Sequence, residues 1–178
     1  MDQMTLFRIV SAALTLLLAV AAWTDYRSRR IPNAITVSGL AVALLLRALV
    51  GPEAILDGLV GALLAFVLTL PLLILGVMGG GDAKLLIAIG AFMGPRHFLT
   101  AATLIAIIGG MMAAVDAGRR GVLLPVLYNC GQIMKHWATF GRRGVNRSFA
   151  TVGALTIPYG IAIAVGALLW WFAGVQRL

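Results

Sequence analysis

The sequence predicts an all-α polytopic membrane protein with about six transmembrane helices. Hydrophobic residues make up 61% of its 178 residues and charged residues only 11%, whereas soluble domains carry about 25% charged residues. Apolar runs follow one another along the whole chain, and a run of about 20 residues crosses a hydrocarbon core of about 30 Å. Residues 1–178 are therefore expected to form a single integral-membrane domain.

Five of the apolar runs have the length of a membrane-spanning helix, and the fourth is shorter. The runs cover residues 4–23, 34–50, 55–77, 84–93, 97–116 and 152–174. Twelve residues from Asp82 to Met93 would extend only about 18 Å as a helix. We therefore expect a short, broken or re-entrant-like helix after the GGGD sequence at 79–82. Gly94-Pro95 should end this helix and begin the next one.

Lys and Arg side chains are distributed unequally between the two sides that six spans would create. Ten fall on one side: Arg27, Arg29, Arg30, Lys84, Arg119, Arg120, Lys135, Arg142, Arg143 and Arg147. Four fall on the other: Arg8, Arg47, Arg96 and Arg177. The positive-inside rule makes the ten-charge side cytoplasmic and places both termini outside. The net charge of +8 thus indicates contact with anionic lipid headgroups rather than with nucleic acid.

Residues 117–151 form the longest segment between apolar runs. At helical spacing among polar residues, with arginine pairs on either side, stand Leu123, Leu127, Cys130, Met134 and Trp137. This pattern is typical of an amphipathic helix that lies on the membrane surface. We expect a basic cytoplasmic loop with such an interfacial helix.

Two of the six acidic residues are expected to meet at one side of the membrane. Asp25 follows the first span and Asp82 precedes the fourth, so the expected topology brings both to the cytoplasmic side. Asp116 is a third acid at this depth, but the arginines at 119 and 120 are its expected partners. Glu53 and Asp57 fall in an outer loop.

A pair of carboxyl groups at one membrane depth can catalyse peptide hydrolysis. Two carboxyl groups that share a site cannot both ionise cheaply, so one keeps its proton near neutral pH. The ionised partner accepts a proton from the attacking water, while the protonated one polarises the peptide carbonyl and later protonates the leaving amine. The glycines at 79–81 would let a substrate backbone approach Asp82 closely.

Two motifs surround these acids. The first acid opens the loop DYRSRRIPN at 25–33, and the second follows the three glycines of GGGDAK at 79–84. The chain resembles the prepilin peptidases, membrane aspartic proteases with a D-x-R-x-x-x-I-P-N loop and a later G-x-G-D-x-K turn. IPYG at 157–160 looks like the third, softer signature of that family. Met78 and Ile161 depart from the common pattern, where Phe and Pro are frequent.

The resemblance implies an aspartic endopeptidase that removes a short basic leader from type IV prepilins or pseudopilins. Cleavage would occur at the cytoplasmic face of the bacterial inner membrane, on a substrate with a hydrophobic helix after its leader. Larger members carry a cytoplasmic insertion with paired CxxC motifs and also methylate the new amino terminus. This chain has one cysteine, Cys130, and no such insertion, so it looks like the short, peptidase-only form of Flp (Tad-type) pili.

Asp25 and Asp82 are the expected catalytic residues, and neither a metal nor an organic cofactor is required. His97 and His136 lie far apart in the expected topology, which leaves no metal site. Supporting or substrate-binding roles are assigned to residues of the three motifs: Gly79, Gly80, Gly81, Lys84, Arg27, Asn33 and Tyr159.

For three of these residues a simpler role is also open. Lys84 could act on the acid or anchor its helix at the headgroups. Arg27 could serve only as cytoplasmic positive charge, and Asn33 could cap the second span.

Two other functions remain open at this stage. A small proton-coupled transporter could use buried acids as a relay, but such proteins usually show repeated halves with matched broken helices, and only one GGGD segment occurs here. A non-catalytic subunit of a pilus or secretion assembly would leave the paired acids unexplained.

Overall fold

A computed structural model shows a bundle of helices. It describes residues 2–74, 76, 78–122, 124, 128 and 159–174. Within these residues the chain forms five helices and no strand, which confirms the all-α class. The helices are α1 (Gln3–Ser28), α2 (Asn33–Ala48), α3 (Pro52–Ile74), α4 (Gly80–Arg119) and α6 (Tyr159–Gly174).

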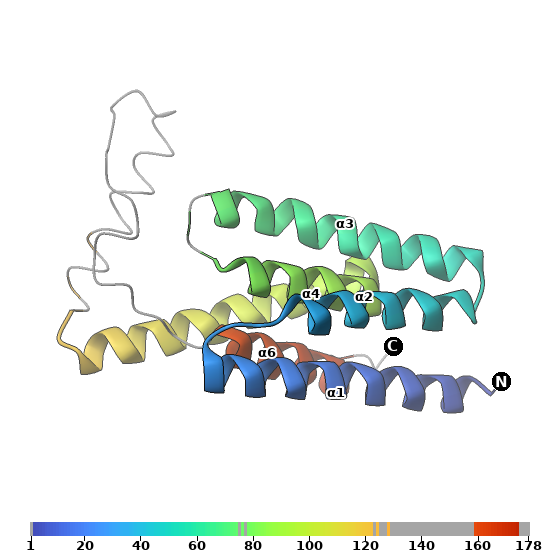
Figure 1. Cartoon of the computed structure of the whole chain (residues 1–178), viewed down its shortest axis with the longest axis horizontal. Helices are drawn as coiled ribbons and strands as arrows, with labels where there is room; N and C mark the ends of the chain where they lie inside the picture. Colours follow the sequence, from blue (N-terminus) through green and yellow to red (C-terminus); the bar gives the residue numbers. More distant parts are fainter. Residues whose placement is uncertain are drawn as a thin grey trace, which may run out of the picture.

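Successive helices run in opposite directions along the long axis (Figure 1). Helix α4 is interrupted at Gly94, where φ is 75° and ψ is 171°. Its first segment runs toward the right in Figure 1, and its second segment runs back toward the left. This confirms the expected break at Gly94-Pro95, and Pro95 contributes to it because proline has no N–H to donate within a helix. Helix α1 consequently begins at the right-hand end of the bundle, and α6 runs from the left back toward that side.

Three of the helices are long and apolar enough to cross a membrane. They cover Met4–Ser28, Pro52–Ile74 and Gly80–Arg119. Helices α2 and α6 are apolar but have only 16 residues each, or about 24 Å. The expectation of six membrane-spanning helices is therefore not confirmed, whereas a helical membrane protein is.

The outward faces of the helices are rich in large apolar side chains. Leu16 on α1, Leu45 on α2 and Leu63 on α3 are each more than 60% exposed. A soluble monomer rarely presents such large apolar patches, so these faces are suited to lipid. The buried contacts instead use small residues: Gly61 on α3 lies directly against Gly90 on α4. Small residues at a helix–helix interface let two backbones approach closely in a membrane.

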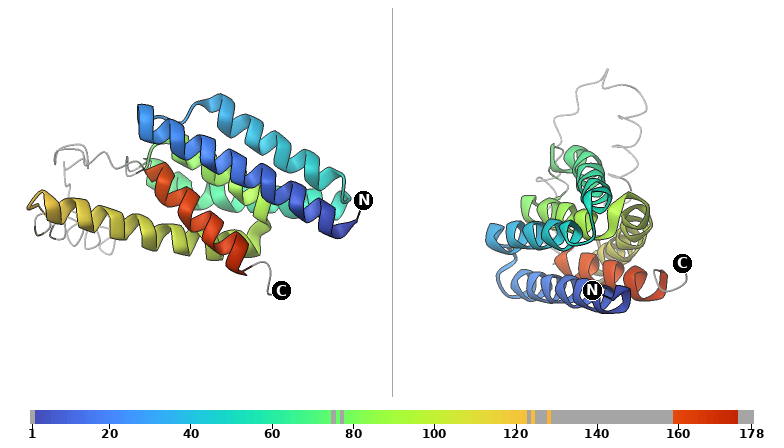
Figure 2. Two further views of the ribbon diagram at one scale, coloured as in Figure 1. Left: turned by 90° about the horizontal axis from the view of Figure 1, so that it is seen from below. Right: turned by 90° about the vertical axis from the view of Figure 1, so that its right-hand side faces the viewer.

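Helices α1 and α6 are joined by a buried polar contact. The indole Nε1–H of Trp171 donates to the hydroxyl oxygen of Ser11 over 2.8 Å. The Trp171 ring also stacks on Phe7, with ring centres 5.8 Å apart. Helix α6 lies between α1 and the second segment of α4 (Figure 2), so its placement relative to both depends on contacts of this kind.

The interruption of α4 is held by Arg47 at the end of α2. Its guanidinium donates to the carbonyl oxygen of Phe92 over 3.0 Å and to that of Ala54 over 2.9 Å. It also forms an ion pair with Asp57 at 2.7 Å. The Phe92 carbonyl would bond to an N–H four residues on in a continuous helix, and the break at Gly94 leaves it to Arg47. The sequence had predicted only that Arg47 lies on the side of the membrane away from the cytoplasm.

Some expected boundaries were wrong. Helix α3 begins at Pro52, so Glu53 lies in its first turn and Asp57 lies within it rather than in a loop. Proline suits this first position because its fixed φ is already helical. Helix α4 continues to Arg119 and so includes the first three residues of the segment expected as a loop from 117. The predicted interfacial helix in 117–151 lies almost wholly outside the described residues.

Candidate active site

Asp25 lies in the last turn of α1 and is only 6% exposed. It had been expected on a separate loop, but the helix continues to Ser28 before the chain turns. The turn forms because Arg29 adopts a left-handed conformation with φ 51° and donates its N–H to the Asp25 carbonyl oxygen. The backbone of Asp25 is therefore held by the last turn of α1.

Asp82 lies in the first turn of α4 and is half-buried. Gly79 is the N-cap of this helix, so Asp82 is its third residue. An acidic side chain at this position can reach back to the N-cap, and the backbone of Gly79 bonds to Asp82 here. The first turn of α4 thus sets the direction of the carboxyl group.

The structure brings the two acids together. The last turn of α1, which carries Asp25, and the first turn of α4, which carries Asp82, lie at the same end of the bundle, on the left in Figure 1, and the charge of Asp25 acts on the Asp82 carboxyl group. We call this the site end. The two residues are 57 positions apart in the sequence.

Helix α6 provides the third side of the site. The backbone N–H of Gly160 donates to Oδ2 of Asp25 over 2.8 Å, in a buried position. Gly160 is the second residue of α6, and the first N–H groups of a helix have no partner within it. The positive ends of two helix dipoles, those of α4 and α6, therefore point toward the carboxyl pair and offset part of the cost of burying it.

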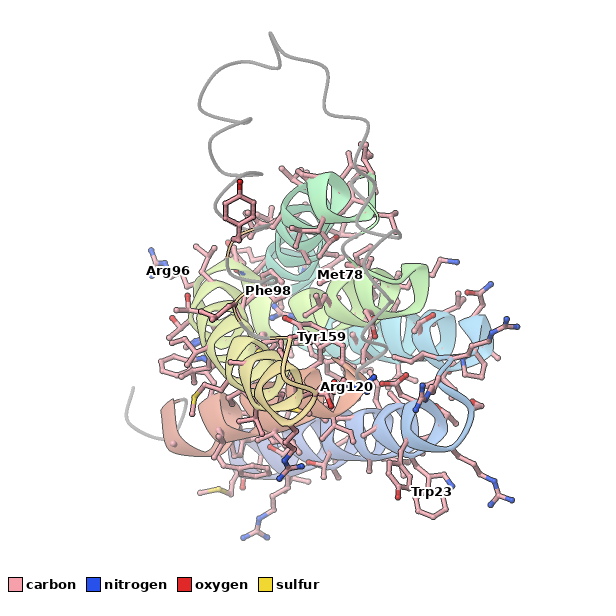
Figure 3. All side chains as sticks on the ribbon, turned by 90° about the vertical axis from the view of Figure 1, so that its left-hand side faces the viewer. Trp23, Met78, Arg96, Phe98, Arg120 and Tyr159 are labelled. Atoms are coloured by element: carbon pink, nitrogen blue, oxygen red, sulfur yellow. The ribbon has the colours of Figure 1, made fainter. Side chains whose placement is uncertain are left out.

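Tyr159 lies at the centre of the site end (Figure 3). It is the first residue of α6, and its half-buried ring packs against Gly109 on the second segment of α4. Its hydroxyl group is also within the influence of the Asp82 charge. The sequence motif IPYG pointed to Tyr159, but it did not indicate that the next residue, Gly160, would contact Asp25.

The three glycines before Asp82 differ in their surroundings. A Cβ on Gly80 would meet no atom within 4 Å, so this residue borders open space. A Cβ on Gly79 would lie 3.1 Å from Oδ2 of Asp82. Gly81 packs on the α1–α2 loop, where a Cβ would lie 3.2 Å from Ile31. Only Gly79 precedes the helix, so the expected GGGD turn is largely the first turn of α4.

Two supporting residues bind each other rather than the acids. The Lys84 ammonium donates to Oδ1 of Asn33 over 2.8 Å, which joins the starts of α4 and α2. The expectation that Asn33 caps α2 was wrong: Pro32 occupies the N-cap position and no side chain caps the helix. Asn33 is instead the first helical residue, and its side chain is engaged by Lys84.

Within the described residues, the remaining candidates make no ion pair with either acid. Arg27 is exposed in the last turn of α1, and no ion pair joins it to either acid in the described part of the chain. Asp116 pairs with Arg120 at 3.0 Å, which confirms its expected arginine partner. His97 packs beside Trp170, with ring centres 6.2 Å apart. His136 lies outside the described residues.

Comparison with known protein families gives one match. Residues 12–115 match the type IV leader peptidase family. The chain belongs to the type IV leader peptidase family. The matched residues include both acids and the whole of α2 and α3 but end before α6, so the contact between Gly160 and Asp25 lies outside them. No curated protein and no solved structure gives a match.

Family membership supports a peptidase in a membrane. It agrees with the resemblance drawn from the D-x-R-x-x-x-I-P-N and G-x-G-D-x-K motifs, and both of these motifs fall within the matched residues. The structure adds that the two acids of these motifs share one site.

Proposed function

We propose that this protein is an aspartic endopeptidase that cleaves the leader from type IV prepilins or pseudopilins of the Flp type, with Asp25 and Asp82 as its catalytic pair. The observation that carries the proposal is the meeting of these two carboxyl groups at one end of the bundle, each in a defined backbone setting. Membership of the type IV leader peptidase family supports the same reaction.

The two acids differ in exposure, and this suggests how the substrate enters. Asp25 is buried and its Oδ2 accepts the Gly160 N–H. Asp82 is half-buried beside Gly80, which borders open space. The substrate backbone approaches from the Gly80 side and places its scissile carbonyl between the two carboxyl groups.

The reaction needs one ionised and one protonated carboxyl group. The ionised group takes a proton from water as the water oxygen attacks the peptide carbon. The protonated group donates a hydrogen bond to the carbonyl oxygen and stabilises its developing negative charge. When the tetrahedral intermediate collapses, the C–N bond breaks and a proton passes to the leaving amine. The protein's own carboxyl groups supply every proton transfer in this scheme.

In this proposal the site end faces the cytoplasm of a bacterial inner membrane and both termini lie outside. Helices α1, α2, α3 and α6 and the two segments of α4 would make up the six spans. The exposed arginines 27, 29 and 30 at the site end would contact anionic headgroups. The substrate leader would be cut at this boundary, without methylation of the new amino terminus.

The test is co-expression with an Flp-type prepilin, with leader removal followed as a mobility shift. The arms are wild type, Asp25→Asn, Asp82→Asn and Asp116→Asn, each with its membrane level measured. We expect cleavage to be lost in the first two variants and kept in the third, because Asp116 is engaged by Arg120. Cleavage at the wild-type rate by either Asp25→Asn or Asp82→Asn would refute the two-carboxylate mechanism.

A wild-type protein that cuts no prepilin would favour a non-catalytic assembly subunit. The transporter alternative gains no support from the fold, because α4 is the one helix with an internal break in the described part of the chain. A relay transporter would be expected to have a matched second break.

A further inference from the structure

The first turn of α6 lies between two other helices at the site end. On one side the Tyr159 ring packs against Gly109 of α4, and on the other the Gly160 backbone meets the Asp25 carboxyl group of α1. Figure 2 shows α6 between these two helices. A displacement of the Tyr159 ring by α4 would therefore move the next residue, Gly160, and with it the hydrogen bond to Asp25.

Neither contact has room for a larger residue. A Cβ on Gly109 would overlap the Tyr159 ring, with the hydroxyl oxygen 2.7 Å and Cζ 2.8 Å away. A Cβ on Gly160 would lie 2.9 Å from Oδ2 of Asp25. Packed interiors respond to such overlap by shifting backbones and side chains rather than by compressing. The absence of a side chain at both positions thus sets how closely α6 approaches each neighbour.

The residue after Gly109 offers a natural comparison. Gly110 is exposed, and a Cβ there would meet no atom within 4 Å. Both glycines lie in the interior of the second segment of α4, so alanine brings the same gain in helix propensity at either position. The two substitutions differ in one respect, the contact with Tyr159.

We propose that Gly109 and Tyr159 are positioning residues of the peptidase site, because the ring resting on Gly109 holds the Gly160 N–H against Asp25 and so fixes Asp25 relative to Asp82. This inference rests on the proposed function. A hydrogen bond to a charged group depends on short, aligned geometry. When the first turn of α6 moves, Asp25 loses its donor and its orientation toward the second carboxyl group.

The proposal predicts an effect on the chemical step rather than on substrate binding. Displacing a catalytic group by about 1 Å can lower a rate about a hundredfold. We expect Gly109→Ala to lower kcat by about ten- to a hundredfold while KM stays within about threefold. Gly110→Ala should stay within about twofold of wild type in both constants.

The experiment measures leader removal by purified wild type, Gly109→Ala, Gly110→Ala, Tyr159→Leu and the double variant Gly109→Ala/Tyr159→Leu, over a range of prepilin concentrations. The shorter leucine leaves room for the Cβ at position 109, so the double variant should cleave no more slowly than Tyr159→Leu alone. Such non-additivity identifies two residues that act through one contact. A purely structural role for Gly109 would lower the amount of folded protein without changing kcat per folded molecule.

Two results would overturn the inference. One is equal kcat for Gly109→Ala and Gly110→Ala; the other is fully additive losses in the double variant. If Gly109→Ala does not accumulate in membranes, Tyr159→Leu carries the test, since wild-type kcat for that variant would also refute the inference. Asp25→Asn and Asp82→Asn in the same assay distinguish failure of this inference from failure of the proposed function. If these two variants cleave normally, the proposed function itself fails.

Discussion

Arg47 connects three helices at the end of the bundle opposite the two acids. Its side chain is only 17% exposed, whereas the side chain of its ionic partner Asp57 is 51% exposed. The bonds to the Phe92 and Ala54 carbonyls are partly buried, whereas the bond to Asp57 is exposed, and the Phe92 carbonyl has lost its helical partner at the Gly94 break. Arg47→Met keeps most of the aliphatic length and removes every hydrogen bond, so it isolates the polar contribution.

The expected cost follows from these exposures. A hydrogen bond from a charged donor contributes about 1.5–3 kcal/mol, and its loss leaves a protected carbonyl unpaired. The half-exposed ion pair with Asp57 adds at most about 1 kcal/mol, because water screens it. We expect Arg47→Met to lower the free energy of unfolding by about 3 kcal/mol. For a chain of this size the Tm should fall by about 6–12 °C.

The assay is thermal unfolding of the detergent-solubilised protein, followed by tryptophan fluorescence. Asp57→Asn is the matched control, because it removes the ion pair but leaves the Phe92 carbonyl bonded to Arg47. It should cost about 1 kcal/mol or less. Arg8→Met, at an exposed position on α1, should leave the Tm within about 1 °C. An unchanged Tm in Arg47→Met, or an equal loss in Asp57→Asn, would refute the assignment of the two carbonyl bonds, to Phe92 and Ala54, as the main stabilising contacts.

Three further outcomes are expected. Ser11→Ala strands the buried indole N–H of Trp171 and should lower the free energy of unfolding by about 1–3 kcal/mol; a Tm equal to wild type would contradict this. Gly81→Ala should lower the Tm, because its Cβ would lie 3.2 Å from Ile31 in the α1–α2 loop, whereas Gly80→Ala meets open space and should leave the Tm unchanged; a larger Tm loss in Gly80→Ala than in Gly81→Ala would argue against this packing. Lys84→Met removes the exposed hydrogen bond to Asn33 and should lower the free energy of unfolding by less than about 1 kcal/mol. A larger loss in thermal unfolding would contradict the exposed setting of this contact.

The sequence predicted most of the helices, but it did not predict which side chains from distant parts of the chain contact one another. Periodic apolar runs and Gly94-Pro95 located the helices and the break, because helix formation and its termination depend on nearby residues. The limits of α3 were misplaced, since Pro52 can begin a helix as readily as it can end one. Asn33 was expected to cap α2 but instead binds a lysine 51 positions away, which local pattern does not specify.

For Asp25 and Asp82, too, the sequence predicted the position along the chain but not the contacts. Motif spacing and alternating topology placed Asp25 and Asp82 at the same end, because each span reverses the direction of the chain. The sequence did not indicate that Asp25 would be buried within α1, nor that Gly160 would donate to it across 135 residues. The IPYG motif marked the neighbourhood of this contact, without indicating what it touches.

By itself the sequence determined the helical membrane class, the interruption of α4, the two motifs and the family that they resemble. These follow from composition and short-range order, which are properties of neighbouring residues. Tertiary packing alone decided that Gly109 receives the Tyr159 ring, that Gly160 reaches Asp25 and that Arg47 takes over the Phe92 carbonyl. Each of these contacts joins helices distant in the chain, and its geometry depends on how closely two backbones can approach, which is settled only when all the side chains between them are packed.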